Sequence, residues 1–399
     1  MLWLTRNTQQ LMPFIPFLLS ARMTTIDLFF PVSHLHEATI ASVINTLPTL
    51  CPNLREIHLI GLQRDPSITA AVSNLVLKTN RSTLRSFRVD SPLTDEAREM
   101  IYKHPDLYSL HTFVNGSAPL PTMVLPNLAD MDIRYCHGHD WLQCFLGASL
   151  RKLTSITISP ESDSILDNIL EAFETVALTT SIPMTLSMFE LYATCQWRPS
   201  YRSLFSFTQL RKLVIESSCD LGCSSTIDDD TAINLARAMP ELWHLQLGDD
   251  PCGTPAGVTV KGLAALAYYC PNLSSLAIHF QVGSFTPLET PSLASIGGST
   301  ISPKVCALTT LQVAGIRVPA ESALMVALTL LRISPYLEDI EYYNAEWGKV
   351  SDAMYDSRRL AQYSSEICLF AAPRSVTDDH IYTSTIRGNV RERYLIAKR

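Results

Sequence analysis

The chain has 399 residues, of which 47% are apolar and 17% are charged, so it has ample material for a continuous core and its composition argues against disorder. Its formal net charge of -7 offers no broad basic surface, which argues against nucleic acid or an anionic membrane as the partner. No run approaches the roughly 18 apolar residues of a membrane-spanning helix, so we expect no association with a membrane.

The N-terminal residues admit two interpretations. A basic residue followed by the apolar stretch 11–19 resembles a short secretory signal. Pro13 and Pro16 interrupt that stretch, however, and residues 23–28 already carry the repeat pattern that fills the rest of the chain. We therefore interpret the stretch as the helix of a first repeat, with a cleaved signal as the alternative.

The pattern L-x-x-L-x-L, with other apolar residues allowed at its second and third positions, recurs along nearly the whole chain. The ten steps between Leu54 and Leu337 cover 283 residues, or about 28 per repeat, which is near the upper end for leucine-rich repeats. One copy is degenerate because Thr112 takes its third apolar position. The copies begin at Leu54, Leu84, Leu107, Leu128, Leu153, Leu186, Leu210, Leu242, Leu273, Leu308 and Leu337.

Each copy predicts one short strand, because apolar residues that alternate with polar ones are typical of a strand with one buried face. Asp65 before Pro66 suits a helix N-cap and first helical position, and Asp228 to Asp230 place negative charge at a helix N-terminus. A proline two residues before the leading leucine of six copies ends the preceding helix. The predicted helices cover 67–78, 163–178, 229–239, 259–269 and 320–332.

A unit of this size cannot bury its apolar faces alone, so neighbouring units must stack and share a core. We predict an α/β leucine-rich-repeat solenoid, a horseshoe of about 11–12 repeats with parallel strands on its concave face and helices on its convex face. The solenoid should occupy residues 1–345, and 346–399 should form a C-terminal capping or tail segment. The Asn or Cys that usually follows the strand is clear only at Cys136, so we expect no asparagine ladder.

The chain resembles the F-box and leucine-rich-repeat proteins of mushroom-forming fungi over most of its length. Two segments carry the likeness, Leu47-Pro48-Thr49-Leu50-Cys51-Pro52-Asn53-Leu54 and the stretch from Gly262 to Leu273, which contains Cys270-Pro271-Asn272-Leu273. In that family an N-terminal F-box docks on the Skp adaptor of a cullin ubiquitin ligase, and the repeats hold the substrate. The resemblance therefore implies the substrate-recognition part of an SCF-type ligase.

The F-box itself departs from the family pattern. No F-box-like Leu-Pro-x-Glu helix start precedes the first repeat, so we expect this module to be missing. A truncated gene model, an F-box-less paralogue and a module too divergent to recognise are the open explanations. A Skp-type adaptor and a cullin are expected partners only if an F-box is present. The alternative is an F-box-less adaptor or scaffold unrelated to ubiquitin.

The residues before, between and after the inward apolar positions of each strand should point to the concave face, where an unknown protein target would bind. Aromatic and arginine side chains are the expected anchors, and carboxylates set the charge of the partner. For each of them an ordinary solvated sheet face is the alternative. The candidates are His58, Arg88, Asp132, Arg134, Tyr192, Lys212, Glu216, His244, His279, Glu341 and Tyr343, with Asp90, Asp130, Glu190 and Asp339 at equivalent positions.

Other motifs favour structural interpretations, and we expect no catalysis, cofactor or metal. The segment 137–140, His-Gly-His-Asp, fits no ligand spacing and is interpreted as a loop. Cys219 and Cys223 lack a second pair of ligands, and the sequence around Gly257 and Lys261 lacks the Gly-Lys-Ser/Thr step of a phosphate loop.

The cysteines indicate the compartment, and the last residues form a local basic run. Ten cysteines at irregular spacing favour buried, reduced thiols and hence the cytoplasm or the nucleus. The tail carries a net positive charge, which we interpret as solvated, with electrostatic binding as the alternative. Its basic residues are Arg387, Arg391, Arg393, Lys398 and Arg399.

Overall fold

The computed structural model describes part of the chain, divided between two compact units, Met1–Met354 and Tyr355–Arg399. The boundary predicted between residues 345 and 346 stays a prediction, because compactness does not define where a repeat ends. The described residues are 14–30, 37–62, 64–79, 83–114, 122–135, 150–160, 175, 185–194, 201–218, 227–247, 257–278, 280, 306–313, 318–319, 322–342 and 345–371.

Twelve strands of the first unit form one sheet that is parallel throughout, in the order of the chain from β1 to β12. The predicted parallel strands are confirmed, including the one expected at residues 23–28 and the one from the degenerate copy. The strands are β1 Thr25–Phe29, β2 Glu56–Ile60, β3 Ser86–Pro92, β4 Ser109–Val114, β5 Asp130–Tyr135, β6 Ser155–Pro160, β7 Met188–Thr194, β8 Lys212–Ser218, β9 His244–Leu247, β10 Ser275–Ile278, β11 Thr310–Val313 and β12 Asp339–Tyr342.

One backbone contact recurs at all eleven junctions between these strands. The carbonyl just before each strand accepts two amides from the next unit, as Arg55 O does from Arg85 N at 2.7 Å and Ser86 N at 3.0 Å. Because the same contact repeats, the strands begin in register although the loops between them differ in length; one register shift follows, between β3 and β4, where Arg88 pairs with His111 and Pro92 with Phe113. The inward side chains therefore line up from strand to strand, as Ile57 does with Phe87.

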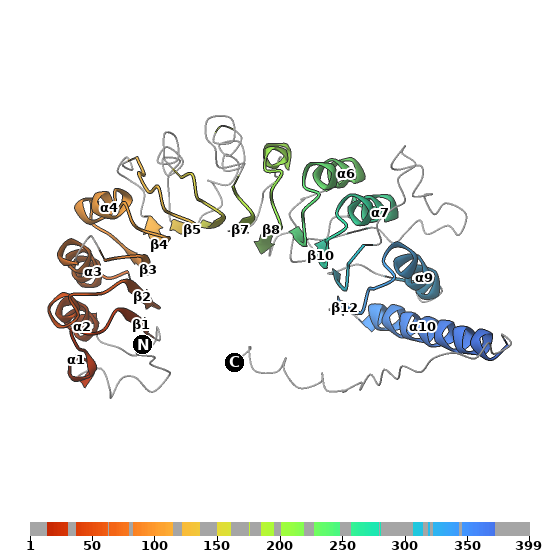
Figure 1. Ribbon diagram of the computed structural model, residues 1–399, viewed down its shortest axis with the longest axis horizontal. Coiled ribbons are helices and arrows are strands. Elements are labelled where there is room, and N and C mark those ends of the chain that lie inside the picture. The colour runs from red at the N-terminus through yellow and green to blue at the C-terminus, as the bar shows by residue number, and fades with distance from the viewer. Residues whose placement is uncertain are drawn as a thin grey trace, which may run out of the picture. The chain divides into compact units, whose positions relative to one another are not determined.

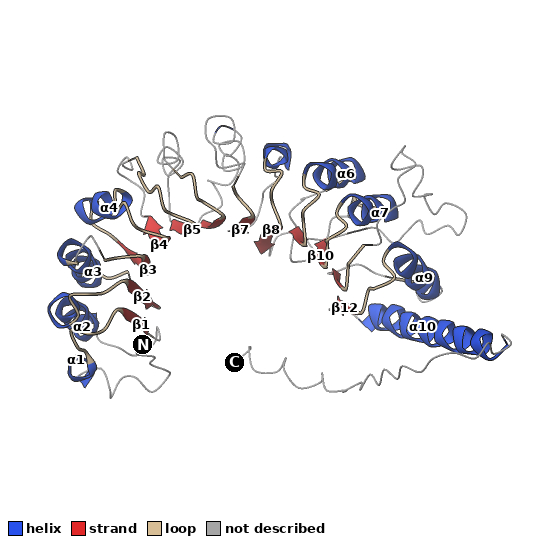
Figure 2. Ribbon diagram, in the orientation of Figure 1, coloured by secondary structure: helices blue, strands red, loops and turns tan. Residues whose placement is uncertain are grey.

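Helices cover one side of this sheet within the first unit and leave the other side open (Figure 1, Figure 2). The predicted caps are confirmed, since Asp65 accepts a hydrogen bond from Ser67 N at 2.7 Å and Asp228 from Thr231 N at 2.8 Å. The helix predicted at 163–178 lies outside the described residues except for residue 175. The helices are α1 Ile15–Leu18, α2 Glu37–Leu50, α3 Pro66–Lys78, α4 Asp95–Tyr102, the 3-10 helix η6 Tyr201–Ser206, α6 Asp229–Ala238, α7 Val260–Tyr269, α9 Ala323–Ile333 and α10 Ala345–Ala371.

The core lies between the strands and the helices. Leucines that lead the repeats, such as Leu54 and Leu128, are buried there together with the inward strand residues. At the C-terminal end of the first unit Trp347, from α10, is 1% exposed and packs edge-on against Phe280, with ring centroids 5.7 Å apart. This contact closes the end of the core.

Small polar side chains in the turns before the strands link neighbouring units. Cys270 Sγ donates to Met239 O at 3.4 Å, Cys306 Sγ donates to Leu273 O at 3.6 Å, and Ser334 Oγ donates to Leu308 O at 2.8 Å. Burial raises the pKa of the Cys270 thiol to about 12, so this side chain acts as a packed donor and not as a nucleophile. Among the described residues no helix is long and apolar enough to cross a membrane.

Candidate protein-binding face

The side chains of β1–β12 that point away from the helices form what we call the open sheet face. Alternation along each strand defines it, as in β2, where Ile57 and Leu59 are buried while Glu56, His58 and Ile60 are not. Because the sheet is in register, equivalent positions of neighbouring strands lie side by side, roughly 5 Å apart. The face is therefore continuous from strand to strand.

Most of the predicted candidates lie on this face. His279 and Tyr343 lie outside the described residues. Arg134 and Glu341 are exposed, while Tyr192 and Glu216 are partly buried. The candidates placed on the open sheet face are His58, Arg88, Asp132, Arg134, Tyr192, Lys212, Glu216, His244 and Glu341, together with Asp90, Asp130, Glu190 and Asp339 at the equivalent positions.

Ion pairs hold several of these side chains in fixed positions over β3, β4 and β5. Arg88 Nη2 lies 3.0 Å from Asp130 Oδ2, which also accepts a hydrogen bond from Ser109 Oγ at 3.0 Å. His111 Nδ1 lies 2.5 Å from Asp132 Oδ2, a contact that is an ion pair only when the imidazole is protonated. Such pairs are partly exposed and contribute little to stability, but they fix the orientation of the charges that a partner would meet.

A second group lies over β7, β8 and β9. Glu190 contacts Lys212 Nζ at 2.5 Å through Oε1 and accepts a hydrogen bond from Tyr192 Oη at 2.9 Å through Oε2. Burial, together with the Glu190 carboxylate, raises the pKa of the Tyr192 hydroxyl well above its usual value, so this group stays a donor. Gln246 Nε2 donates to Glu216 Oε1 at 2.9 Å. These contacts join three successive strands across the face.

Asp90, in the C-terminal half of β3, stabilises the fold. Its Oδ2 accepts a hydrogen bond from Gly61 N at 2.7 Å, and its Oδ1 accepts one from Leu62 N at 3.1 Å. The carboxylate therefore holds the turn that follows β2. A partner would meet this side chain with both oxygens already engaged.

Two histidines of the face give the folded state a pH dependence. Burial, followed by the charge of Arg88, lowers the pKa of His58 from 6.5, against smaller opposite effects of Asp27 and Glu56. Burial and the nearby Lys212 likewise lower the pKa of His244. Both histidines are therefore neutral at neutral pH, and the folded state resists their protonation.

The sign of this dependence follows from proton binding. With depressed folded pKa values, the unfolded chain binds more protons than the folded chain as pH falls through about 6.5, so the stability contributed by the neutral histidines is complete above that pH and declines below it. We expect the double variant His58→Gln, His244→Gln to lose less free energy of unfolding than the wild type between about pH 7.5 and pH 5.5. Urea denaturation at both pH values measures this, and an equal loss in the two proteins would contradict it.

Several side chains of this surface, among them the ionisable Asp27, Glu56 and His111, were not among the predicted candidates. His111 comes from the degenerate copy, whose strand was predicted but whose outward positions were not included among the candidates. Asp27 and Glu56 lie on β1 and β2, and they line a pocket of about 450 Å³. The rule that selected His58 also points Glu56 to the same face, so the signal was present in the alternation. The pocket residues are Ser20, Arg22, Met23, Thr24, Thr25, Asp27, Glu56 and His58.

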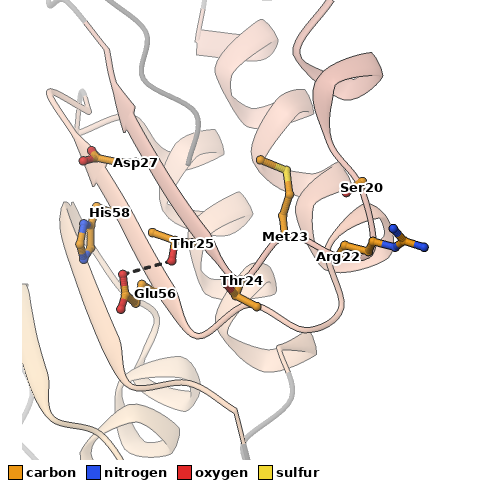
Figure 3. A pocket seen from close by; sticks show the side chains of 8 residues that line it. All are labelled: Ser20, Arg22, Met23, Thr24, Thr25, Asp27, Glu56 and His58. Carbon is orange, nitrogen blue, oxygen red and sulfur yellow. Dashed lines mark hydrogen bonds between the residues drawn. The ribbon is translucent and has the colours of Figure 1, made fainter.

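Figure 3 shows the arrangement of this pocket. The carboxylates of Asp27 and Glu56 and the ring of His58 gather along β1 and β2, while the guanidinium of Arg22 points away from them. Thr25 Oγ1 donates to Glu56 Oε2 at 3.2 Å. The described part of this pocket therefore presents acceptors on the side of the open sheet face.

The other motifs of the sequence are only partly described. His137, His139, Cys219 and Cys223 lie outside the described residues, and within the described ones no group of three or more His, Cys, Asp or Glu could hold a metal ion. In the weak phosphate-loop pattern, the amide of Gly262 donates to Asp229 Oδ1 at 3.0 Å, so it is already engaged by the preceding unit.

No family model and no curated protein matches this sequence.

Proposed function

We propose that the chain is a leucine-rich-repeat horseshoe that binds another protein through the open sheet face, without performing catalysis itself. The observation that carries the proposal is the continuous parallel sheet, whose outer side chains include charged and aromatic groups held in place by pairs such as Lys212 with Glu190. Preoriented side chains lower the entropy cost of binding a partner. Spread over many strands, they suit an extended protein surface better than a small substrate.

The negative charge of the face favours a protein as its partner over a nucleic acid. Carboxylates such as Asp27, Glu56 and Glu341 repel phosphate groups, whereas binding of nucleic acid relies on clusters of lysine and arginine. The spacing of the repeats supports the leucine-rich-repeat assignment, because strands separated by 20–30 residues with intervening helices are typical of that architecture.

A more specific role rests on the resemblance to fungal F-box proteins. In this proposal the face recognises substrates of an SCF-type ubiquitin ligase in the cytoplasm or nucleus, and a Skp-type adaptor with a cullin supplies the ubiquitin transfer. An adaptor or scaffold without any link to ubiquitin is the second candidate, because the open sheet face by itself does not specify ubiquitin transfer.

The first experiment is affinity capture of the whole chain from its native cell extract, with mass spectrometry scored for Skp adaptor and cullin. Recovery of both supports the ligase receptor. Enrichment of some other protein without them supports the scaffold. Recovery of no protein above the background of an unrelated repeat protein would contradict both candidates.

Use of the open sheet face is tested by reversing one exposed charge on it. We expect Glu341→Lys to reduce capture of the enriched partner at least about tenfold, because the face is mainly acidic and reversing a carboxylate costs more than 1.4 kcal/mol when it then meets a like charge. Glu241→Lys is the matched control, since Glu241 is exposed in the turn before β9, outside the open sheet face. Equal capture by both variants would exclude the face as the binding surface.

A further inference from the structure

The open sheet face is far more acidic than the chain as a whole. Its described strands place nine carboxylates on this face against three lysines and arginines, whereas the whole chain has 38 acidic and 31 basic residues. A partner with complementary charge would be basic. The carboxylates are Asp27, Glu56, Asp90, Asp130, Asp132, Glu190, Glu216, Asp339 and Glu341, and the bases are Arg88, Arg134 and Lys212.

The carboxylates of the face differ in the groups that already bind them. In the centre of the face, Asp130 and Glu190 form ion pairs with Arg88 and Lys212. At the β1 end, the hydrogen bond that Glu56 accepts comes from the neutral hydroxyl of Thr25. Negative charge without an ion-pair partner among the described residues therefore lies beside the pocket on β1 and β2, as it also does at Asp339 and Glu341 on β12.

Exposed apolar side chains lie next to that pocket. Phe29 and Ile60 end β1 and β2, face each other in register and are 48% and 39% exposed. Asp27 and His58 are the register pair two positions earlier on the same strands. An exposed apolar patch beside polar groups is typical of a protein-binding surface. The combination suits a basic side chain that is followed by an apolar one.

We propose that the open sheet face docks an extended, arginine-rich segment of a partner protein, with one arginine anchored in the pocket between Asp27 and Glu56 and an adjacent apolar side chain on Phe29 and Ile60. This rests on the proposed function and adds the chemistry of the partner. Arginine suits the pocket because its planar guanidinium has five donors and forms charge-assisted hydrogen bonds with carboxylates. The pocket volume of about 450 Å³ leaves room for such a side chain.

The test measures binding of a fluorescein-labelled synthetic peptide, in which arginine alternates with leucine and serine, to the whole chain by fluorescence anisotropy. Matched peptides carry glutamine or glutamate in place of arginine. The variant Asp27→Asn, Glu56→Gln removes two charges from the pocket while keeping the side-chain shapes. The control Glu241→Gln, Asp352→Asn removes two charges at exposed positions outside the open sheet face.

We expect the arginine peptide to bind and the other two to bind at least about tenfold more weakly. The pocket variant should raise the Kd of the arginine peptide at least about tenfold, and the control variant less than about threefold. An equal rise in both variants would mean diffuse charge attraction and would overturn the assignment of the pocket. If the glutamine peptide bound as tightly as the arginine peptide, the proposal that the partner is basic would be wrong.

The two experiments together distinguish a partner of another chemistry from a partner that binds another surface. If Glu341→Lys lowers capture of the native partner but the arginine peptide does not bind the wild type, the face binds protein of another chemistry. If capture is unchanged by Glu341→Lys while the peptide binds in the pocket, the native partner uses another surface. Circular dichroism of each variant confirms that the fold is retained.

Discussion

Replacing Trp347 by alanine is expected to lower the free energy of unfolding by about 3–5 kcal/mol. The side chain is almost fully buried between the end of the sheet and the rest of the core, and its ring meets that of Phe280 at 76°. Truncation removes these contacts and leaves a cavity that the surrounding chain closes only in part. Guanidinium denaturation followed by circular dichroism measures the loss, because the tryptophan fluorescence itself changes in the variant.

The loss of stability in the Trp347→Ala variant should be confined to the C-terminal end of the sheet. In a chain of stacked units each unit contacts mainly its neighbours, so removal of an end contact should release the nearest strands first. We expect faster amide hydrogen exchange in β11 and β12 and little change in β1–β4. The control Lys349→Ala alters an exposed position of the same helix and should change stability by less than about 0.5 kcal/mol. Uniform loss of protection along the sheet would contradict a local role.

The strands could be predicted because their signal is local. Two apolar residues in alternation, led by a leucine, require one buried face wherever the unit is stacked. Even the copy at Leu107 forms a strand, β4, since register with β5 places Thr112 at an inward position, where it is 2% exposed. Helix starts at Asp65 and Asp228 were likewise local, because a capping side chain serves the next few amides.

The contacts between units could not be predicted in the same way. Arg88 and Asp130 meet although they are 42 residues apart and sit on strands that are not neighbours. Arg88 reaches across β4 to Asp130, two residues before Asp132, which is its equivalent in register, and the alternation does not specify such a diagonal contact. The pocket was missed for a related reason, since Ser20 and Thr24 precede β1 and belong to no strand alternation.

Asp90 shows a further limit of reasoning from alternation. Its position on β3 selects it for the open sheet face, but its two oxygens bind the amides of Gly61 and Leu62. The sequence pattern fixes where a side chain points and does not show which backbone groups it will reach. The turn that Asp90 holds also contains Gly61, whose backbone is left-handed.

Replacing Gly61 by alanine is expected to destabilise the chain by at least about 2 kcal/mol, because an L-residue pays about 1–2 kcal/mol for left-handed backbone and here it also meets a clash. Gly61 has φ +78°, and a Cβ atom would lie 2.0 Å from Phe30 O, which is a backbone atom. Phe30 N donates to Ile60 O, so a shift of either segment would strain the junction between β1 and β2. Urea denaturation of the variant and the wild type measures the difference.

Gly348→Ala provides the matched control, because the same substitution there has the opposite expected sign. Gly348 lies inside α10 without a left-handed φ, and its added Cβ would lie 3.2 Å from the hydroxyl of Tyr342, a side chain that is 41% exposed and free to give way. Alanine in place of a helical glycine stabilises by up to about 1 kcal/mol. If Gly61→Ala changed stability as little as Gly348→Ala, the turn at Gly61 would not lie as close to Phe30 as described. The shape of the surface beside the pocket on β1 and β2 would then also be wrong.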